Sequence, residues 1–171
     1  MAHTALEMPD TVYTTLGCKV SYAWEATAGT MPTTGYEIIM DCIKSPSIGG
    51  EPDEVETTPL IATKNKTYVQ LLQELADKTI VCNATDAAFA IHKDMLTTKA
   101  TNLATSPVKC MWVCVDIAMA EEAFFVRCMP SNKNLAAQEP NSKVDVTIPL
   151  EIIGDWEEHA KPTYTNDPAS A

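Results

Sequence analysis

The chain has 171 residues, of which 46% are hydrophobic and 20% charged, values typical of one globular domain. Twelve Lys and Arg residues stand against 23 Asp and Glu residues, so the net charge is -11, and Arg127 is the only arginine. Proteins that grip nucleic acid cluster their cations. The lysines here are scattered, which argues against tight nucleic-acid binding.

Neither a membrane span nor a leader sequence is indicated. No apolar run approaches the ~20 residues that a membrane-spanning helix needs. The opening residues, "MAHTALEMPD", have neither the basic region nor the apolar region of a signal peptide. We therefore expect a protein that is made in the cytoplasm and does not associate with a membrane.

The first half of the chain alternates between strands and loops. In "GCKVSYAWEA", apolar or aromatic residues occupy every second position from Cys18 to Trp24, which predicts a half-buried strand. "YEIIMDCI", residues 36–43, predicts a second strand. Residues 44–59 form a long loop with three prolines, two adjacent glycines and several acids, although residues 55–62 could hold a short edge strand.

The second half contains the predicted helix. "TYVQLLQELADK" is ambiguous, because its leucines fit a helical stripe of barely two turns. A strand, "TIVCNAT", precedes a helix that Thr85 or Asp86 can cap and that presents Ala88, Ile91 and Met95 on one face. Lys93 and Lys99 are expected in its last turns.

The remaining elements are strands. Two are predicted at about 109–119 and 123–129. The last is predicted at 144–152, where apolar and polar residues alternate until Gly154 ends the strand. Residues 1–160 are therefore expected to form one mainly β domain with one α-helix, an antiparallel sandwich or barrel. Residues 161–171 have the composition of a flexible C-terminal tail.

The segment "VKCMWVCVDIAM" raises the question of a metal or redox site at Cys110 and Cys114. Its β-branched residues favour a strand. Cysteines four residues apart on a strand are separated by ~13 Å, which is too far for one zinc ion or for a disulfide. We therefore expect these residues to be small apolar side chains in a sheet, and the six cysteines to be free buried thiols.

The predicted hairpin of these two strands is apolar on both sides. An antiparallel hairpin with one face in water should have a polar side, and this one shows little polarity. A neighbouring subunit could cover one face, which would make Trp112, Cys114, Phe125 and Arg127 candidate interface residues. Burial of both faces inside one domain is an equally good interpretation.

No arrangement of residues predicts catalysis. His92 and His159 each stand near a carboxylate, which is a common pattern, and His92 is expected to be a hydrogen-bonded structural histidine on the helix. Motifs for nucleophilic, metal-dependent or nucleotide-dependent chemistry are absent from the sequence. We expect no enzyme activity, no cofactor and no metal site.

The order of features resembles the major tail protein, or tail tube protein, of long-tailed bacteriophages, from about Thr14 to Glu158. The most specific segment is "GYEIIMDCIKSPSIGGEPDEVETTPL", followed by "YVQLLQELAD", a helix from Asp86 and the ending "VDVTIPLEIIGDWEE". The family opens similarly to "TTLGCKVSYA". A glycine that the family commonly carries between Leu71 and Asp77 is missing here.

The resemblance implies a β-sandwich flanked by a helix that assembles into homohexameric rings, which stack into a tube in the virion. The tube would enclose a tape measure protein, contact tail terminator and distal tail or baseplate proteins, and conduct DNA without binding it specifically. A related secretion-system or contractile-system tube protein has the same architecture. A monomeric β-sandwich binding module is the alternative from another class.

In that family the loop after the second strand reaches toward the adjacent ring, which here corresponds to the loop at 44–59. The candidate inter-ring residues are Pro46, Gly49, Gly50, Glu51, Asp53, Glu54 and Glu56.

Overall fold

The computed structural model describes residues 17–48, 52–56, 68–73, 78–135 and 143–167. Its elements in chain order are β1 Lys19–Trp24, β2 Thr34–Ile38, β3 Cys42–Lys44, β4 Pro52–Glu56, β5 Tyr68–Gln73, β6 Thr79–Asn83, α1 Asp86–Leu103, β7 Met111–Asp116, β8 Glu122–Pro130, β9 Asn134–Leu135, β10 Asp145–Ala160 and β11 Thr163–Tyr164. The prediction of a mainly β fold with one helix is confirmed.

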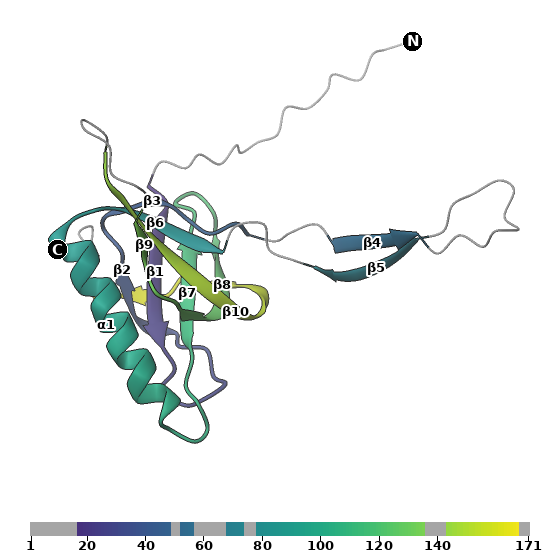
Figure 1. The fold of residues 1–171 in the computed structure, drawn as a ribbon, viewed down its shortest axis with the longest axis horizontal. Helices are drawn as coiled ribbons and strands as arrows, with labels where there is room; N and C mark the ends of the chain where they lie inside the picture. The colour runs from purple at the N-terminus through teal and green to yellow at the C-terminus, as the bar shows by residue number, and fades with distance from the viewer. Residues whose placement is uncertain (1–16, 49–51, 57–67, 74–77, 136–142, 168–171) are drawn as a thin grey trace, which may run out of the picture.

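Most strands belong to one curled, mixed sheet (Figure 1). Its order is β11-β2-β1-β7-β8-β10-β6-β3, and β9 also pairs with β10. All pairs are antiparallel except β11 with β2. The two edges of this sheet are close together, because β2, the neighbour of the edge strand β11, is joined to the other edge strand, β3, by only residues 39–41. A link of that length reaches no more than about 14 Å, so the sheet curls into a half-barrel.

The predicted strand at 36–43 is therefore two strands rather than one. β2 ends at Ile38, and a turn follows in which the Cys42 amide donates to the Ile39 carbonyl at 3.1 Å. The chain then leaves β1 and pairs with β6 as β3. A continuous apolar run does not reveal this change of partner, because burial sets the pattern of apolar residues and not the identity of the neighbouring strand.

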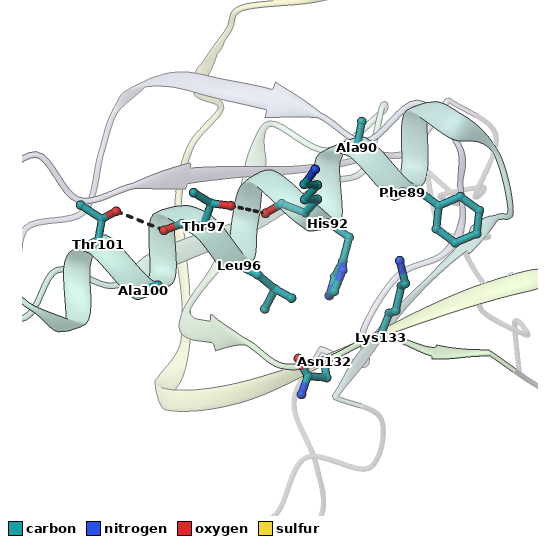
Figure 2. A pocket seen from close by; sticks show the side chains of 10 residues that line it. Phe89, Ala90, His92, Leu96, Thr97, Ala100, Thr101, Asn132 and Lys133 are labelled. Carbon is teal, nitrogen blue, oxygen red and sulfur yellow. Dashed lines mark hydrogen bonds between the residues drawn. The ribbon is translucent and has the colours of Figure 1, made fainter.

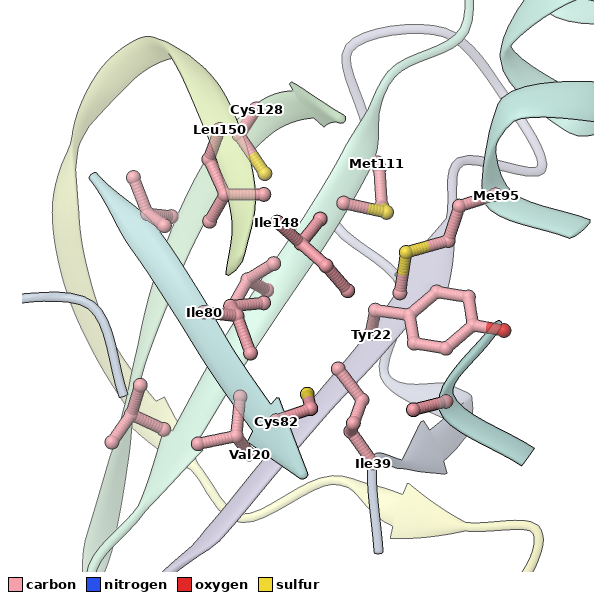
Figure 3. Close-up of a cluster of buried hydrophobic side chains, with 14 of the residues drawn as sticks. Val20, Tyr22, Ile39, Ile80, Cys82, Met95, Met111, Cys128, Ile148 and Leu150 are labelled. Atoms are coloured by element: carbon pink, nitrogen blue, oxygen red, sulfur yellow. The ribbon is translucent and has the colours of Figure 1, made fainter. Parts of the chain in front are cut away.

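The main core fills the inside of the curl (Figure 3). Its residues come from β1, β6, β7, β8 and β10, together with Ile39 and the helix residues Ala88 and Met95. Helix α1 starts as predicted, with the Thr85 hydroxyl accepting a hydrogen bond from the Ala88 amide at 3.1 Å. It continues to Leu103, so the expected lysines do not lie in its last turn.

β10 is longer than predicted. Val146, Ile148 and Leu150 are buried as the alternating pattern indicates, but the strand does not end at Gly154. Ile152 pairs with Cys128 and Trp156 with Val126, so four residues of β10 span two of β8. This is a bulge, and a glycine within it tolerates the irregular backbone. The strand then continues along β8 to Ala160.

The ambiguous segment at 67–78 contains strand β5, which pairs with β4. Together they form a hairpin, hereafter the arm, that extends away from the curled sheet (Figure 1). The arm is inserted between β3 and β6, which are themselves antiparallel neighbours. The predicted loop at 44–59 is thus wrong in one respect, because residues 52–56 are a strand.

Candidate assembly surfaces

The arm carries some of the candidate inter-ring residues. Asp53, Glu54 and Glu56 lie on β4, where Glu54 is paired with Gln70 and Glu56 with Tyr68. Gly49, Gly50 and Glu51 fall outside the described residues. Pro46 is fully buried in the body of the domain, so its prediction as a contact to a neighbouring ring is wrong.

The predicted interface hairpin is brought together as expected, but its own chain covers it. Trp112, Cys114 and Phe125 are each at most 5% exposed and form a second core on the outer face of the sheet. Tyr36 packs on Phe125 edge-to-face, with ring centroids 5.7 Å apart. Burial of both faces within one domain is therefore correct, and the prediction of these three residues as subunit contacts is wrong.

Arg127, the fourth of those residues, is held by a buried carboxylate. Its Nε donates to Glu25 Oε1 at 2.6 Å and its Nη2 to Glu25 Oε2 at 3.2 Å. The same carboxylate accepts hydrogen bonds from the Trp112 indole at 3.0 Å, the Cys110 amide at 3.0 Å and the Gly29 amide at 2.9 Å. Glu25 therefore ties the loop after β1 to β7 and β8.

This network keeps Glu25 ionised in the interior. Burial alone would raise its pKa, but the hydrogen bonds from Arg127, the two amides and Trp112 lower the pKa of Glu25 to about 2. The alternation of apolar residues from Cys18 to Trp24 puts Glu25, the next residue, on the polar side of the strand and gives no sign of its burial. The sequence held one signal for the pair, because a lone arginine on an apolar strand requires a carboxylate partner.

The C-terminal segment 161–167 is docked on the sheet. The Tyr164 hydroxyl donates to Asp116 Oδ2 at 2.7 Å, and Lys161 Nζ lies 2.7 Å from Asp116 Oδ1. Asn166 hydrogen-bonds both the amide and the carbonyl of Ile38. The prediction of a flexible tail is therefore wrong for residues 161–167, which seal the second core. Residues 168–171 lie outside the described residues.

An apolar groove of about 690 Å³ lies at the root of the arm. It is formed by the start of β1, the β2–β3 connection, β3 and the residues that follow, and the end of β7. Three of its residues, Met40, Ile43 and Ile48, are 53%, 47% and 39% exposed. Large apolar side chains gathered in this way are typical of an interaction surface.

A second, wide groove of about 970 Å³ runs between α1 and residues 132–133 (Figure 2). His92 and Leu96 point toward it from the helix, and Lys133 Nζ lies 4.5 Å from the centre of the Phe89 ring. His92 Nε2 hydrogen-bonds the Ser131 carbonyl at 2.9 Å, so this nitrogen carries a proton. His92 is therefore a structural histidine that fastens the helix to the end of β8, as predicted.

Among the described residues, no group of His, Cys, Asp or Glu side chains could hold a metal ion. No helix in that part of the chain is both long and apolar enough to span a membrane.

Comparison with known proteins gives a likeness of fold. No family model matches the chain, and no curated protein does. Several chains of solved structures are similar, among them a chain of the cryo-EM structure of the anti-feeding prophage (AFP) baseplate, symmetrised sixfold. The superposition has a TM-score of 0.52 at 8% identity and covers 91% of this chain and 98% of that one. The chain thus shares the fold of that baseplate chain.

Proposed function

We propose that this chain is a structural subunit of a phage tail or a related tail-type particle. The likeness to the baseplate chain supports this most strongly, because it spans nearly the full length of both chains. The projecting arm and the exposed apolar groove at its root are two surfaces suited to contacts between copies.

In its finer form, the proposal is that copies assemble into hexameric rings that stack into a tail tube. The tube would enclose a tape measure protein and join tail terminator and baseplate proteins at its ends. The sealed second core means that neighbouring copies must use surfaces other than Trp112 and Phe125. The groove and the arm are the surfaces we assign to that contact.

The second candidate function is that of a ring subunit in a contractile or secretion-type particle. The likeness to a chain of the anti-feeding prophage baseplate favours it, because that neighbour belongs to a baseplate. The two candidates differ in the length of the stack that purified protein should build. A tube subunit should grow long tubes, whereas a baseplate subunit should stop at single rings.

Purified protein at high concentration, studied by light scattering and negative-stain electron microscopy, tests the proposal. We expect sixfold rings or tubes. A homogeneous monomer at all concentrations would favour the binding module instead.

A pair of variants locates the contact. Met40→Ser with Ile43→Ser removes two exposed side chains of the groove, and Leu103→Ser with Leu135→Ser removes two that are 55% and 45% exposed elsewhere. The groove variant should remain monomeric, whereas the control should assemble like the wild type.

We also propose that DNA passes the assembled particle without being bound. A net charge of -11 and a single arginine, itself paired with Glu25, support this. Gel-shift experiments at low salt, where phosphate contacts are strongest, should show no retardation of duplex DNA. Micromolar binding under those conditions would contradict it.

A further inference from the structure

Cys42 and Cys82 face each other across the β3–β6 pair. The Asn83 amide donates to the Asp41 carbonyl at 2.9 Å, which is the hydrogen bond that flanks a non-hydrogen-bonded antiparallel pair. In such pairs the Cα atoms lie about 4.5 Å apart and both side chains point to the same face. A disulfide needs Cα atoms about 4.4–6.8 Å apart, so the backbone already has a suitable spacing.

The two side chains share one environment but differ in access. Cys82 is fully buried in the main core, where it is seen among the core side chains in Figure 3, and Cys42 packs against the same core. Cys42 is partly exposed and lines the apolar groove. A small oxidant can therefore reach the Cys42 thiol, whereas the Cys82 thiol is shielded from solvent.

The chemistry of the pair is asymmetric in the same sense. A hydrogen bond from the Cys82 thiol lowers the pKa of Cys42, against the opposing effect of partial burial. That hydrogen bond and burial together raise the pKa of Cys82. Because the thiolate is the reactive form, Cys42 is the better nucleophile of the two.

Cys114 and Cys128 lack this arrangement. Cys128 faces Met111 and Cys114 faces Phe125 across the β7–β8 pair. Burial raises the pKa of Cys114 to about 12 and also raises the pKa of Cys128. Cys18 is exposed.

We propose that Cys42 and Cys82 form a thiol pair that small-molecule disulfides oxidise to a cross-strand disulfide. The Cys42 thiolate attacks one sulfur of the small molecule, which forms a mixed disulfide and releases one thiolate. Cys82 loses its proton and attacks the Cys42 sulfur, which releases the second small-molecule thiolate. The two cysteine protons end on the two released thiolates, so one disulfide is reduced as another forms.

The bond would fix the end of the curled sheet. β3 has three residues, and its register with β6 shifts directly after Cys42, so few backbone hydrogen bonds hold it. β3 is also the strand from which the arm departs. The disulfide would fasten the root of the arm to β6 and leave the arm itself unchanged. If the proposed function holds, the subunits would assemble with both thiols reduced inside the cell. The disulfide would form later, when the particle meets oxidising surroundings.

The test uses the purified full-length chain treated with oxidised glutathione, followed by thiol titration in denaturant and mass spectrometry of peptides. The six thiols of the reduced protein should fall to about four, with a peptide pair linked through Cys42 and Cys82. The melting temperature should rise by roughly 5–10 °C, because the bond closes a long loop. Neither readout depends on ring formation, so failure here is distinct from failure of the proposed function.

Two single variants separate this pair from general oxidation. Cys42→Ser should form no internal disulfide and show no rise in melting temperature, and its circular dichroism should confirm that it folds. Cys18→Ser removes another accessible thiol and should still lose two thiols. Equal loss in the Cys42→Ser variant, a stable glutathione adduct on Cys42, or a link between any other two cysteines would overturn the proposal.

Discussion

The centre of the sheet and the arm are both antiparallel β-structure, but they differ in their contacts with the rest of the chain. All six residues of β7 are buried, with the main core on one face and the Tyr36–Phe125 core on the other. The arm has two strands and extends away from the sheet (Figure 1). A two-stranded hairpin is at best marginally stable alone. The curled sheet with α1, hereafter the body, is therefore closed by its own chain, and the arm is the part that a partner can complete.

Glu25 provides the largest expected effect on the body. Glu25→Gln removes the charge that Arg127, Trp112 and two amides hold, and places an NH2 group among donors. Removing one partner of a buried ion pair costs about 3–5 kcal/mol. Because Arg127 is 27% exposed, we expect a loss near the lower end, about 3 kcal/mol, in urea denaturation.

The exposed Glu122 on β8 supplies the matched control. Glu122→Gln should change the free energy of unfolding by no more than about 0.5 kcal/mol. If Glu25→Gln changes the free energy of unfolding equally little, the hydrogen bonds of Glu25 do not stabilise the body.

The same residue should dominate the acid sensitivity of the body. Its pKa is lowered to about 2 in the folded chain, whereas an unfolded glutamate titrates near 4.3. The stability that Glu25 contributes is thus complete above about pH 5 and is lost as pH falls toward 2. The gap in unfolding free energy between wild type and Glu25→Gln should narrow over this window, in denaturation series at fixed salt. A gap that widens on acidification would mean that folding raises the pKa of Glu25 instead of lowering it, which would contradict the prediction.

Tyr164 tests the seal over the second core with a smaller effect. Tyr164→Phe keeps the ring but removes the hydrogen bond to Asp116. Hydrogen bonds to charged groups contribute about 1.5–3 kcal/mol, and Lys161 still pairs with Asp116 in the variant. We expect a loss of about 1–2 kcal/mol, measured by urea denaturation. Thr163→Ala, on the same short strand, should lose less unfolding free energy. An equal loss would show that the seal does not depend on the Tyr164 hydroxyl.

Local patterns predicted the parts of this fold that local physics controls. The alternation of Val146, Ile148 and Leu150 and the cap at Thr85 could be read directly, because burial and capping act over a few residues. The turn between β2 and β3 could not, since Ile38 and Ile39, which lead into it, are both buried and read as the continuation of a strand. Partner choice between distant strands leaves no periodic signal.

The candidate sites divide in the same way. The apolar hairpin was identified correctly, but what covers it depends on Tyr36 and Tyr164, which are 89 and 39 residues from Phe125. A composition typical of disorder hid the seal at 161–167, where Tyr164 and Asn166 make specific hydrogen bonds. The pair of Glu25 with Arg127 joins residues 102 apart. Contacts of this range require the fold itself.

The arm should have the smallest effect on the body and the largest effect on assembly. Because β3 and β6 are antiparallel neighbours, a short Gly-Ser link can replace residues 49–77 without moving either strand. The shortened chain should keep its circular dichroism pattern and melt within a few degrees of the wild type, because the main core contains no arm residue among those described. In electron micrographs it should form no stacked rings or tubes. Long tubes from the shortened chain would show that the arm is not the contact between rings. Loss of folding would instead place the arm within the body and remove the distinction between the two regions.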